Sequence, residues 1–184
     1  MGVGLGIAFL ATETVLVVLT LLALVRTGFA RLESSVGLWK DGLAVGKNAP
    51  PWTLTDTAGK LQRIPSHHHW QLLLFTDHSL MSFPSVLVGI NHLVDFAHDL
   101  EVLVLISQDR KFCQSIAREL RLLAPVVPVD QTFYQRYGVR VMPFVTLLDP
   151  NGIVRWVGLI NTEAQLFHTW KMVRATTVQE DNFS

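Results

Sequence analysis

Cysteine is almost absent from this sequence. The 184 residues include a single cysteine, Cys113. No disulfide can therefore form within the chain, and no cluster of cysteines can bind a metal. Exchange between thiols and disulfides would need sulfur from a second molecule. The shortage does not fix the cellular compartment, because a domain of this size can be held together by its hydrophobic core alone.

An excess of charge of either sign is also missing. Lysine and arginine number 15, as do aspartate and glutamate, so the formal net charge is zero. No basic stripe interleaved with aromatic residues is present to follow a phosphate backbone, which argues against nucleic acid as a partner. A hydrophobic content of 49% with 16% charged residues excludes a disordered chain and predicts one compact domain with an appendage.

The N-terminal region consists of a long apolar run. Glu13 is the only charged side chain between Met1 and Val25. A helix of this length would extend for roughly 37 Å, enough to cross the hydrocarbon core of a bilayer. We therefore predict a single transmembrane anchor over residues 1–26. A cleavable signal peptide is the alternative, but no lysine or arginine precedes the run and no small-residue cleavage site follows it.

Glu13 falls near the middle of this predicted span. An ionised side chain there costs about 3 kcal/mol or more, so we expect it to contact a partner within the membrane. The simpler alternative is that Thr12, Glu13 and Thr14 lie at a lipid defect, or that the true span is shifted. Arg26 and Arg31 follow the run while no basic residue precedes it. By the positive-inside rule they would place the domain in the cytoplasm.

The rest of the chain alternates strands and helices. We predict a linker helix over 27–45, the domain over 46–175 and a loose polar tail over 176–184. Two strand and helix units in succession imply parallel pairing with right-handed crossovers. The expected strands are one within 48–60 before a turn at Ala58–Gly59, then Trp70–Asp77, Glu101–Ser107, Val126–Val129, and a hairpin of Phe144–Leu148 and Ile153–Val157; the expected helices are Ser82–Leu100, Lys111–Leu123 and Thr162–Met172.

Three segments carry a family resemblance. Residues 46–56 and 137–144 resemble the opening and the cis-proline segment of thioredoxin-like and peroxiredoxin-like domains. Residues 158–166 resemble the C-terminal signature of the methylamine utilisation protein D family, membrane-anchored accessory proteins of methylamine dehydrogenase maturation. The resemblance covers nearly the whole chain. It implies a thioredoxin-like α/β fold with a central mixed sheet, a cis peptide bond before Pro143 rather than the ordinary trans bond, and a domain on the periplasmic side of the membrane.

The sequence departs from this family at its reactive motif. Family members carry two cysteines after the first long strand, because one thiolate attacks a disulfide and the second resolves the mixed disulfide. Here the corresponding positions hold Ser79 and Ser82, or Leu80 and Phe83 in the ungapped register. A serine hydroxyl forms no disulfide and is too weak an acid to replace a thiolate. The exchange chemistry of the family therefore does not carry over.

Other candidate sites are weaker. A hydrolytic serine at position 79 or 82, beside Asp77 and His78, is disfavoured because adjacent loop residues rarely converge into a triad, and Ser82 is better explained as a helix N-cap. The consecutive histidines 67–69, with His78, would need three converging nitrogens to bind a metal, so a solvated loop is expected. Cys113 is expected to be a buried apolar side chain rather than a reactive thiol.

These observations favour a protein that binds other proteins without performing chemistry on them. We expect no cofactor and no metal, an integral-membrane or periplasmic protein complex as partner with Glu13 as a contact, and the lipid bilayer as support. The alternative is a thiol-disulfide oxidoreductase acting through an exposed, acidified Cys113 near Pro143. The predicted binding surface comprises Asp77, His78, Ser79, Leu80, Met81, Ser82, Phe83, Met142 and Pro143.

Overall fold

The structure is a computed structural model that describes residues 41–77 and 84–181. The predicted anchor, Glu13 and most of the predicted linker lie outside the described residues. None of the described helices is both long and apolar enough to cross a membrane. The membrane anchor therefore stays a prediction.

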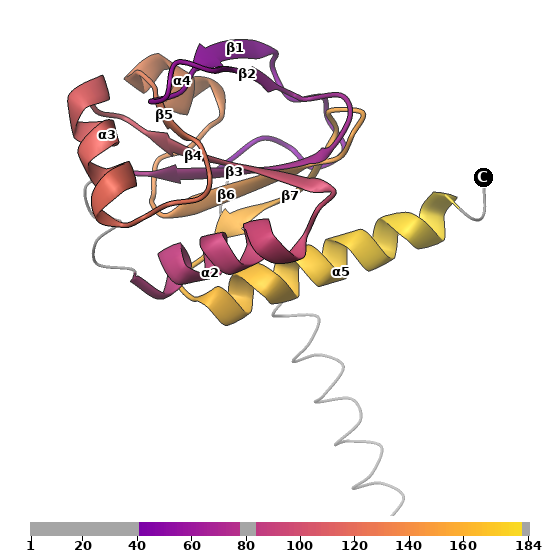
Figure 1. The fold of residues 1–184 in the computed structure, drawn as a ribbon. Coiled ribbons are helices and arrows are strands. Elements are labelled where there is room, and N and C mark those ends of the chain that lie inside the picture. The colour runs from indigo at the N-terminus through magenta and orange to yellow at the C-terminus, as the bar shows by residue number, and fades with distance from the viewer. Residues whose placement is uncertain (1–40, 78–83, 182–184) are drawn as a thin grey trace, which may run out of the picture. The chain divides into compact units, whose positions relative to one another are not determined.

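A five-stranded mixed sheet forms the centre of the domain (Figure 1). Strands β3 and β4 run parallel in its middle, and almost all of their residues are buried, as their continuous apolar sequences predicted. β5 pairs parallel with β4, while β6 and β7 add antiparallel strands on the other side. The strands are β3 (Trp70–Thr76), β4 (Leu100–Ile106), β5 (Val126–Pro128), β6 (Phe144–Leu148) and β7 (Val154–Leu159), in the order β5-β4-β3-β6-β7.

Both faces of the sheet are covered, because side chains alternate between the faces along each strand. Leu72 and Leu74 of β3 point to the face covered by helices α2 (Pro84–Phe96) and α5 (Glu163–Asp181), which lie side by side in Figure 1. α3 (Arg110–Glu119) contributes Cys113 and Ile116 to the same core. On the other face, α4 (Gln131–Arg136) and the hairpin of β1 (Trp52–Thr55) and β2 (Leu61–Ile64) cover a second core that contains Leu73 and Phe75.

Helix ends differ from the sequence prediction. α2 stops at Phe96, four residues before the predicted end at Leu100, and Leu100 opens β4 instead. α3 stops at Glu119 because Arg121 adopts a left-handed conformation with φ of 48°, which leaves the apolar Leu123 outside the helix and exposed. α5 continues past the predicted Met172 to Asp181. No glycine or proline interrupts it, and the predicted loose tail therefore begins inside this helix.

Two elements were not predicted. α4 is only six residues long, too short to show a helical period, although Asp130 caps it by accepting a hydrogen bond from the amide of Phe133 at 2.9 Å. β2 follows the predicted turn at Gly59, whose φ of 91° suits glycine. Asp56 holds this turn through hydrogen bonds from the Lys60 amide and the Gln62 side chain, each 2.8 Å long.

The linker helix predicted for 27–45 is wrong for its last five residues. Residues 41–45 form no helix and instead belong to the domain. The amide of Gly42 donates to the carbonyl of Gly138 at 2.8 Å, and the carboxylate of Asp41 pairs with Arg140. Gly42 has φ of 88° and lies so close to Phe144 that a Cβ atom would approach the ring to 2.7 Å. The packed domain thus includes residues before the predicted boundary at 46.

Candidate functional site

The strand register brings the end of β3 next to the start of β6. Phe75 pairs with Phe144, so Asp77 follows β3 beside the Met142–Pro143 peptide, which is cis as predicted. Pro143 is buried and Met142 is half-buried. The described members of the predicted binding surface therefore do come together. His78, Ser79, Leu80, Met81, Ser82 and Phe83 lie outside the described residues.

A buried tyrosine ties the strands together at this end. The Tyr134 hydroxyl lies 2.6 Å from the carbonyl oxygen of Thr76 and 2.8 Å from that of Leu105, within donating distance of both. Burial raises the pKa of Tyr134, so the hydroxyl stays protonated at neutral pH. Tyr134 comes from α4 and acts as a fixed donor that positions the ends of β3 and β4. The sequence offered no signal for this role.

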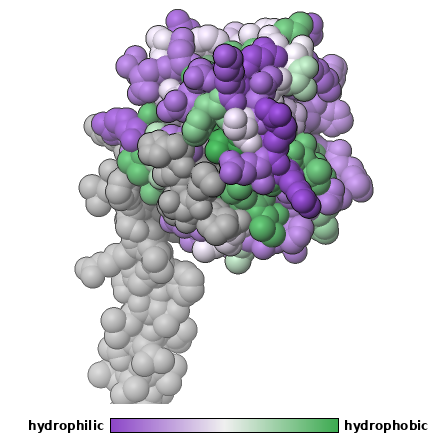
Figure 2. Space-filling model, turned by 60° about the vertical axis from the view of Figure 1, so that its left-hand side comes forward, coloured by the Kyte–Doolittle hydropathy of each residue, from purple (hydrophilic) through white to green (hydrophobic). Residues whose placement is uncertain are grey.

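Apolar side chains are exposed around the cis peptide. Val141 is 39% exposed, and Leu159 is 37% exposed opposite Phe144. The amide of Ile160 donates to the Pro143 carbonyl at 3.4 Å, which holds the end of β7 against the cis-proline segment. Figure 2 turns this end of the molecule toward the viewer and shows apolar surface lying among polar regions. Exposed apolar side chains of this kind favour contact with other apolar groups.

Cys113 does not have the properties of a reactive thiol. Its side chain is completely buried in the core under α3, and its Sγ lies 3.7 Å from the Gln108 carbonyl oxygen. Burial, with a smaller contribution from the nearby Asp109 carboxylate, raises the pKa of Cys113 to about 11. Thiol exchange requires the thiolate and access to it. The expectation of a buried side chain is thus confirmed, and the exposed, acidified thiol needed by the redox alternative is not found.

The consecutive histidines belong to no group of potential metal ligands in the described part of the chain. His67, His68 and His69 are exposed in a loop, where the backbone amides of His68 and His69 lie near the Ser66 hydroxyl. No group of three or more potential metal ligands occurs within residues 41–77 and 84–181. His78, the fourth histidine considered, lies outside that part of the chain. The solvated loop favoured by the sequence is what the structure shows for 67–69.

A polar cavity of about 300 Å³ lies at the opposite end of β3. Its charged groups include the pairs Asp149 with Arg155 and Asp99 with Arg174, each with an N to O distance of 2.7 Å. Trp70 at the start of β3 forms part of the wall, six residues from the end that faces the cis peptide. Because each of these carboxylates is paired with an arginine, the cavity has no unbalanced charge that would indicate which kind of ligand it binds.

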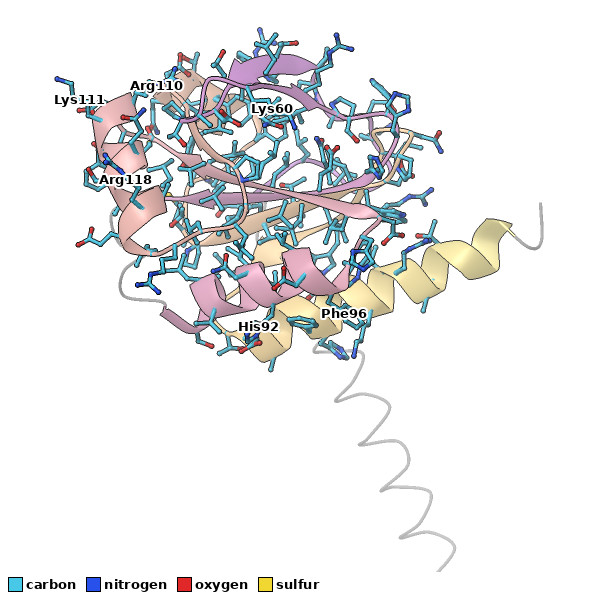
Figure 3. All side chains as sticks on the ribbon, viewed as in Figure 1. Lys60, His92, Phe96, Arg110, Lys111 and Arg118 are labelled. Carbon is cyan, nitrogen blue, oxygen red and sulfur yellow. The ribbon has the colours of Figure 1, made fainter. Side chains whose placement is uncertain are left out.

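Four cations gather near α3 and the turn between β1 and β2 (Figure 3). Arg110 is structural, since its Nη2 donates to the backbone carbonyls of Asp56 at 2.9 Å and Thr57 at 3.3 Å. Acidic residues at both ends of α3, Asp109 and Glu119, accompany the cations. Arg110 thus anchors the turn to the helix, and the nearby acidic residues leave no strong excess of positive charge that would indicate an anionic-ligand site. The four cations are Lys60, Arg110, Lys111 and Arg118.

Solved structures similar to this domain include a thiol-disulfide oxidoreductase, a thiol:disulfide interchange protein and a peroxidoxin. The thioredoxin domain of a thiol-disulfide oxidoreductase from Bacteroides vulgatus has 16% identity and a TM-score of 0.59, covering 71% of this chain and 99% of that one. A putative thiol:disulfide interchange protein DsbE from Chlorobium tepidum has 18% identity and a TM-score of 0.63, covering 72% and 97%. Peroxidoxin BcpB from Mycobacterium tuberculosis has 15% identity and a TM-score of 0.62, also covering 72% and 97%.

These similarities show that the domain has a thioredoxin-like fold. At such low identity they do not transfer an activity. No family model matches the sequence. No curated protein matches it closely enough to count. The specific resemblance to the methylamine utilisation protein D family therefore stays a prediction.

Proposed function

We propose that this protein binds extended polypeptide at the cis-proline end of a thioredoxin-like domain and does not exchange disulfides itself. The main support is a contrast in exposure. Val141 and Leu159 are exposed on either side of Pro143, whereas Cys113, the only cysteine of the sequence, is buried in the core. Apolar side chains grouped on a protein surface favour contact with other apolar groups. The exposed apolar side chains and the buried thiol both support a docking role for this end of the fold.

A binding assay tests this function. The full-length chain, kept in a mild detergent, is titrated against reduced, carboxymethylated and fluorescein-labelled α-lactalbumin, a permanently unfolded protein, and anisotropy is followed. Val141→Asp places a charge where the apolar contact is proposed, and we expect it to weaken binding at least about tenfold, since a buried unpaired charge is costly. Leu123→Asp is the matched control, because Leu123 is exposed in the loop after α3. Equal affinity of the two variants, or no binding by the wild type, would exclude the proposal.

A second candidate is supported by the names of the similar structures, which are thiol-disulfide oxidoreductases and interchange proteins. In this case the Cys113 thiolate would attack a substrate disulfide, form a mixed disulfide with one sulfur and release the other as a thiolate. A thiol from a second molecule would then resolve the mixed disulfide, because Cys113 is the only cysteine of the chain. Reduction of insulin by dithiothreitol tests this candidate: acceleration by the wild type but not by Cys113→Ser would support it.

We also propose that residues 1–26 anchor the domain in a membrane, where it serves as an accessory subunit of a membrane or periplasmic complex. The support is the apolar run with its single charge at Glu13. Purification from native membranes in a mild detergent should yield a stoichiometric complex that dissociates in Glu13→Leu. A reporter fused to the C-terminus tests the periplasmic orientation, against which Arg26 and Arg31 argue.

A further inference from the structure

The outer edge of β7 has an unpaired stretch next to the cis-proline end. In an antiparallel pair, residues alternate between facing the partner strand and facing away. The Ile160 amide donates to the Pro143 carbonyl, so Ile160 faces β6. Counting back by two, Gly158 and Trp156 also face β6. The backbone N–H and C=O groups of Val157 and Leu159 therefore point away from the sheet.

The other half of the same edge is already covered. The amide of Gly46 donates to the Val154 carbonyl at 2.8 Å, and the amide of Val154 donates to the Lys47 carbonyl at 2.9 Å. An irregularity in register between Leu147 and Leu148 separates this half of β7 from the rest. Beyond it, Val157 and Leu159 have no backbone partner among residues 41–77 and 84–181. The uncovered stretch thus begins after the bulge and ends at the candidate site.

The opposite edge of the sheet, formed by β5, is poorly suited to pairing with another strand. β5 is only three residues long and ends in Pro128, which has no N–H to donate. The amide of Thr57 also covers it by donating to the Val126 carbonyl at 2.9 Å. Soluble proteins commonly blunt exposed strand edges with proline, lysine or covering segments. Within residues 41–77 and 84–181, no segment pairs with the backbone at positions 157 and 159, which hold valine and leucine rather than proline or lysine.

We infer that an extended segment of a partner polypeptide adds to the sheet as a strand along Val157 and Leu159. The inference rests on the proposed function and deepens it, because it names how the bound chain is held. Backbone hydrogen bonds would supply affinity independent of sequence, while the exposed Leu159 and half-buried Val157 favour apolar, β-branched side chains in the partner. The occupant must lack proline at the pairing positions, since proline cannot complete a ladder.

Proline substitution at position 157 tests the inference in the same binding assay. Because the Val157 N–H points away from β6, Val157→Pro removes one hydrogen bond to the partner and none within the β6–β7 pair. We expect it to weaken binding of the carboxymethylated α-lactalbumin at least about fivefold. Val157→Thr, which keeps the N–H and the β-branched shape, should bind as the wild type does.

The outcomes separate the inference from the proposed function. If Val141→Asp abolishes binding but Val157→Pro does not, the chain binds at the cis-proline end without strand addition, and the inference is overturned. If the wild type binds nothing, the proposed function fails, and the inference fails with it. A dimer detected by sedimentation and lost in Val157→Pro would identify a second copy as the occupant and overturn the assignment to a partner protein.

Amide hydrogen exchange gives a second test that needs no substitution. In the free protein the amides of Val157 and Leu159 should exchange quickly, while those of Trp156, Gly158 and Ile160 are protected by β6. Addition of the unfolded probe should slow exchange at 157 and 159. Unchanged exchange at both positions in the bound state would refute strand addition even if Val157→Pro failed to fold.

Discussion

The burial of Cys113 predicts how slowly this thiol reacts in the native protein. The pKa of the Cys113 thiol is raised from 9.0 to about 11 by burial, with the carboxylate of Asp109 contributing. At pH 8 this change lowers the thiolate fraction from about one in ten to about one in a thousand, a factor of about 100. The completely buried side chain adds a steric barrier, since the reagent must wait for a local opening.

The assay compares alkylation of Cys113 in native and unfolded protein. Full-length protein is treated with iodoacetamide at pH 8, with and without urea, and the mass increase is followed over time. We expect the native rate to be below about 1% of the unfolded rate, the factor given by the thiolate fraction alone. The Cys113→Ser variant, which has no other cysteine, controls for reaction at other side chains.

A fast native reaction would refute this reasoning. If native Cys113 reacts within about tenfold of the unfolded chain, then α3 opens readily or the thiol is acidified, and the local environment differs from the one described. That result would favour the second candidate function, since a mixed disulfide with a substrate requires the same access. Slow alkylation would instead leave polypeptide binding as the function that the site supports.

Three further predictions concern stability. Tyr134→Phe should lower the free energy of unfolding, measured in urea, by about 1–3 kcal/mol because buried carbonyls lose their hydrogen-bond donor. Tyr137→Phe is the control, since it removes a less buried hydrogen bond to the Pro50 carbonyl and should lower the free energy of unfolding less. Equal losses in the two variants would contradict the role of Tyr134. The pKa of Cys113 is raised in the folded state, so the stability that its neutral thiol contributes to the fold is lost as pH rises from 9 to about 11. Over this range the melting temperature of Cys113→Ala should therefore fall less than that of the wild type. Burial would raise the pKa of Asp56, but its hydrogen bonds lower it overall. The stability that the Asp56 carboxylate contributes to the fold is therefore lost as pH falls below 3.8. Asp56→Asn should lose less stability in acid than the wild type does, as measured by urea unfolding.

Much of the fold could be predicted from the sequence because the central strands are continuous apolar runs of strand length. The apolar runs at 70–76 and 100–106 exceed what a half-exposed strand would carry, so their burial on both faces followed directly. The hairpin around the turn at Asp149–Gly152 and the cis bond before Pro143 were also predicted correctly. A local pattern was sufficient for the hairpin because a short turn joins its strands, whereas the cis bond was predicted from the resemblance to thioredoxin-like domains.

The features that depend on distant contacts could not be predicted. The Tyr134 hydroxyl contacts the carbonyls of Thr76 and Leu105, which lie 58 and 29 positions earlier in the sequence. No local pattern indicates such a contact. The end of α3 is set by the backbone of Arg121, a residue with no special preference for a left-handed conformation. The unpaired edge at Val157 and Leu159 follows from strand order and register, which the sequence alone did not specify.

The asymmetry between the two edges of the main sheet also limits how copies of this protein can associate. Open-ended polymerisation through sheet edges needs two adhesive edges on every molecule, so that each added copy offers a new one. Here β5 is short, ends in Pro128 and is covered at Val126, so in the part of the chain that the structure describes the open stretch lies on β7 and not on β5. Two copies could join edge to edge through Val157 and Leu159, but their pairing would consume both open stretches. Any association of native domains by this route would therefore end at a closed pair and would not grow into fibres.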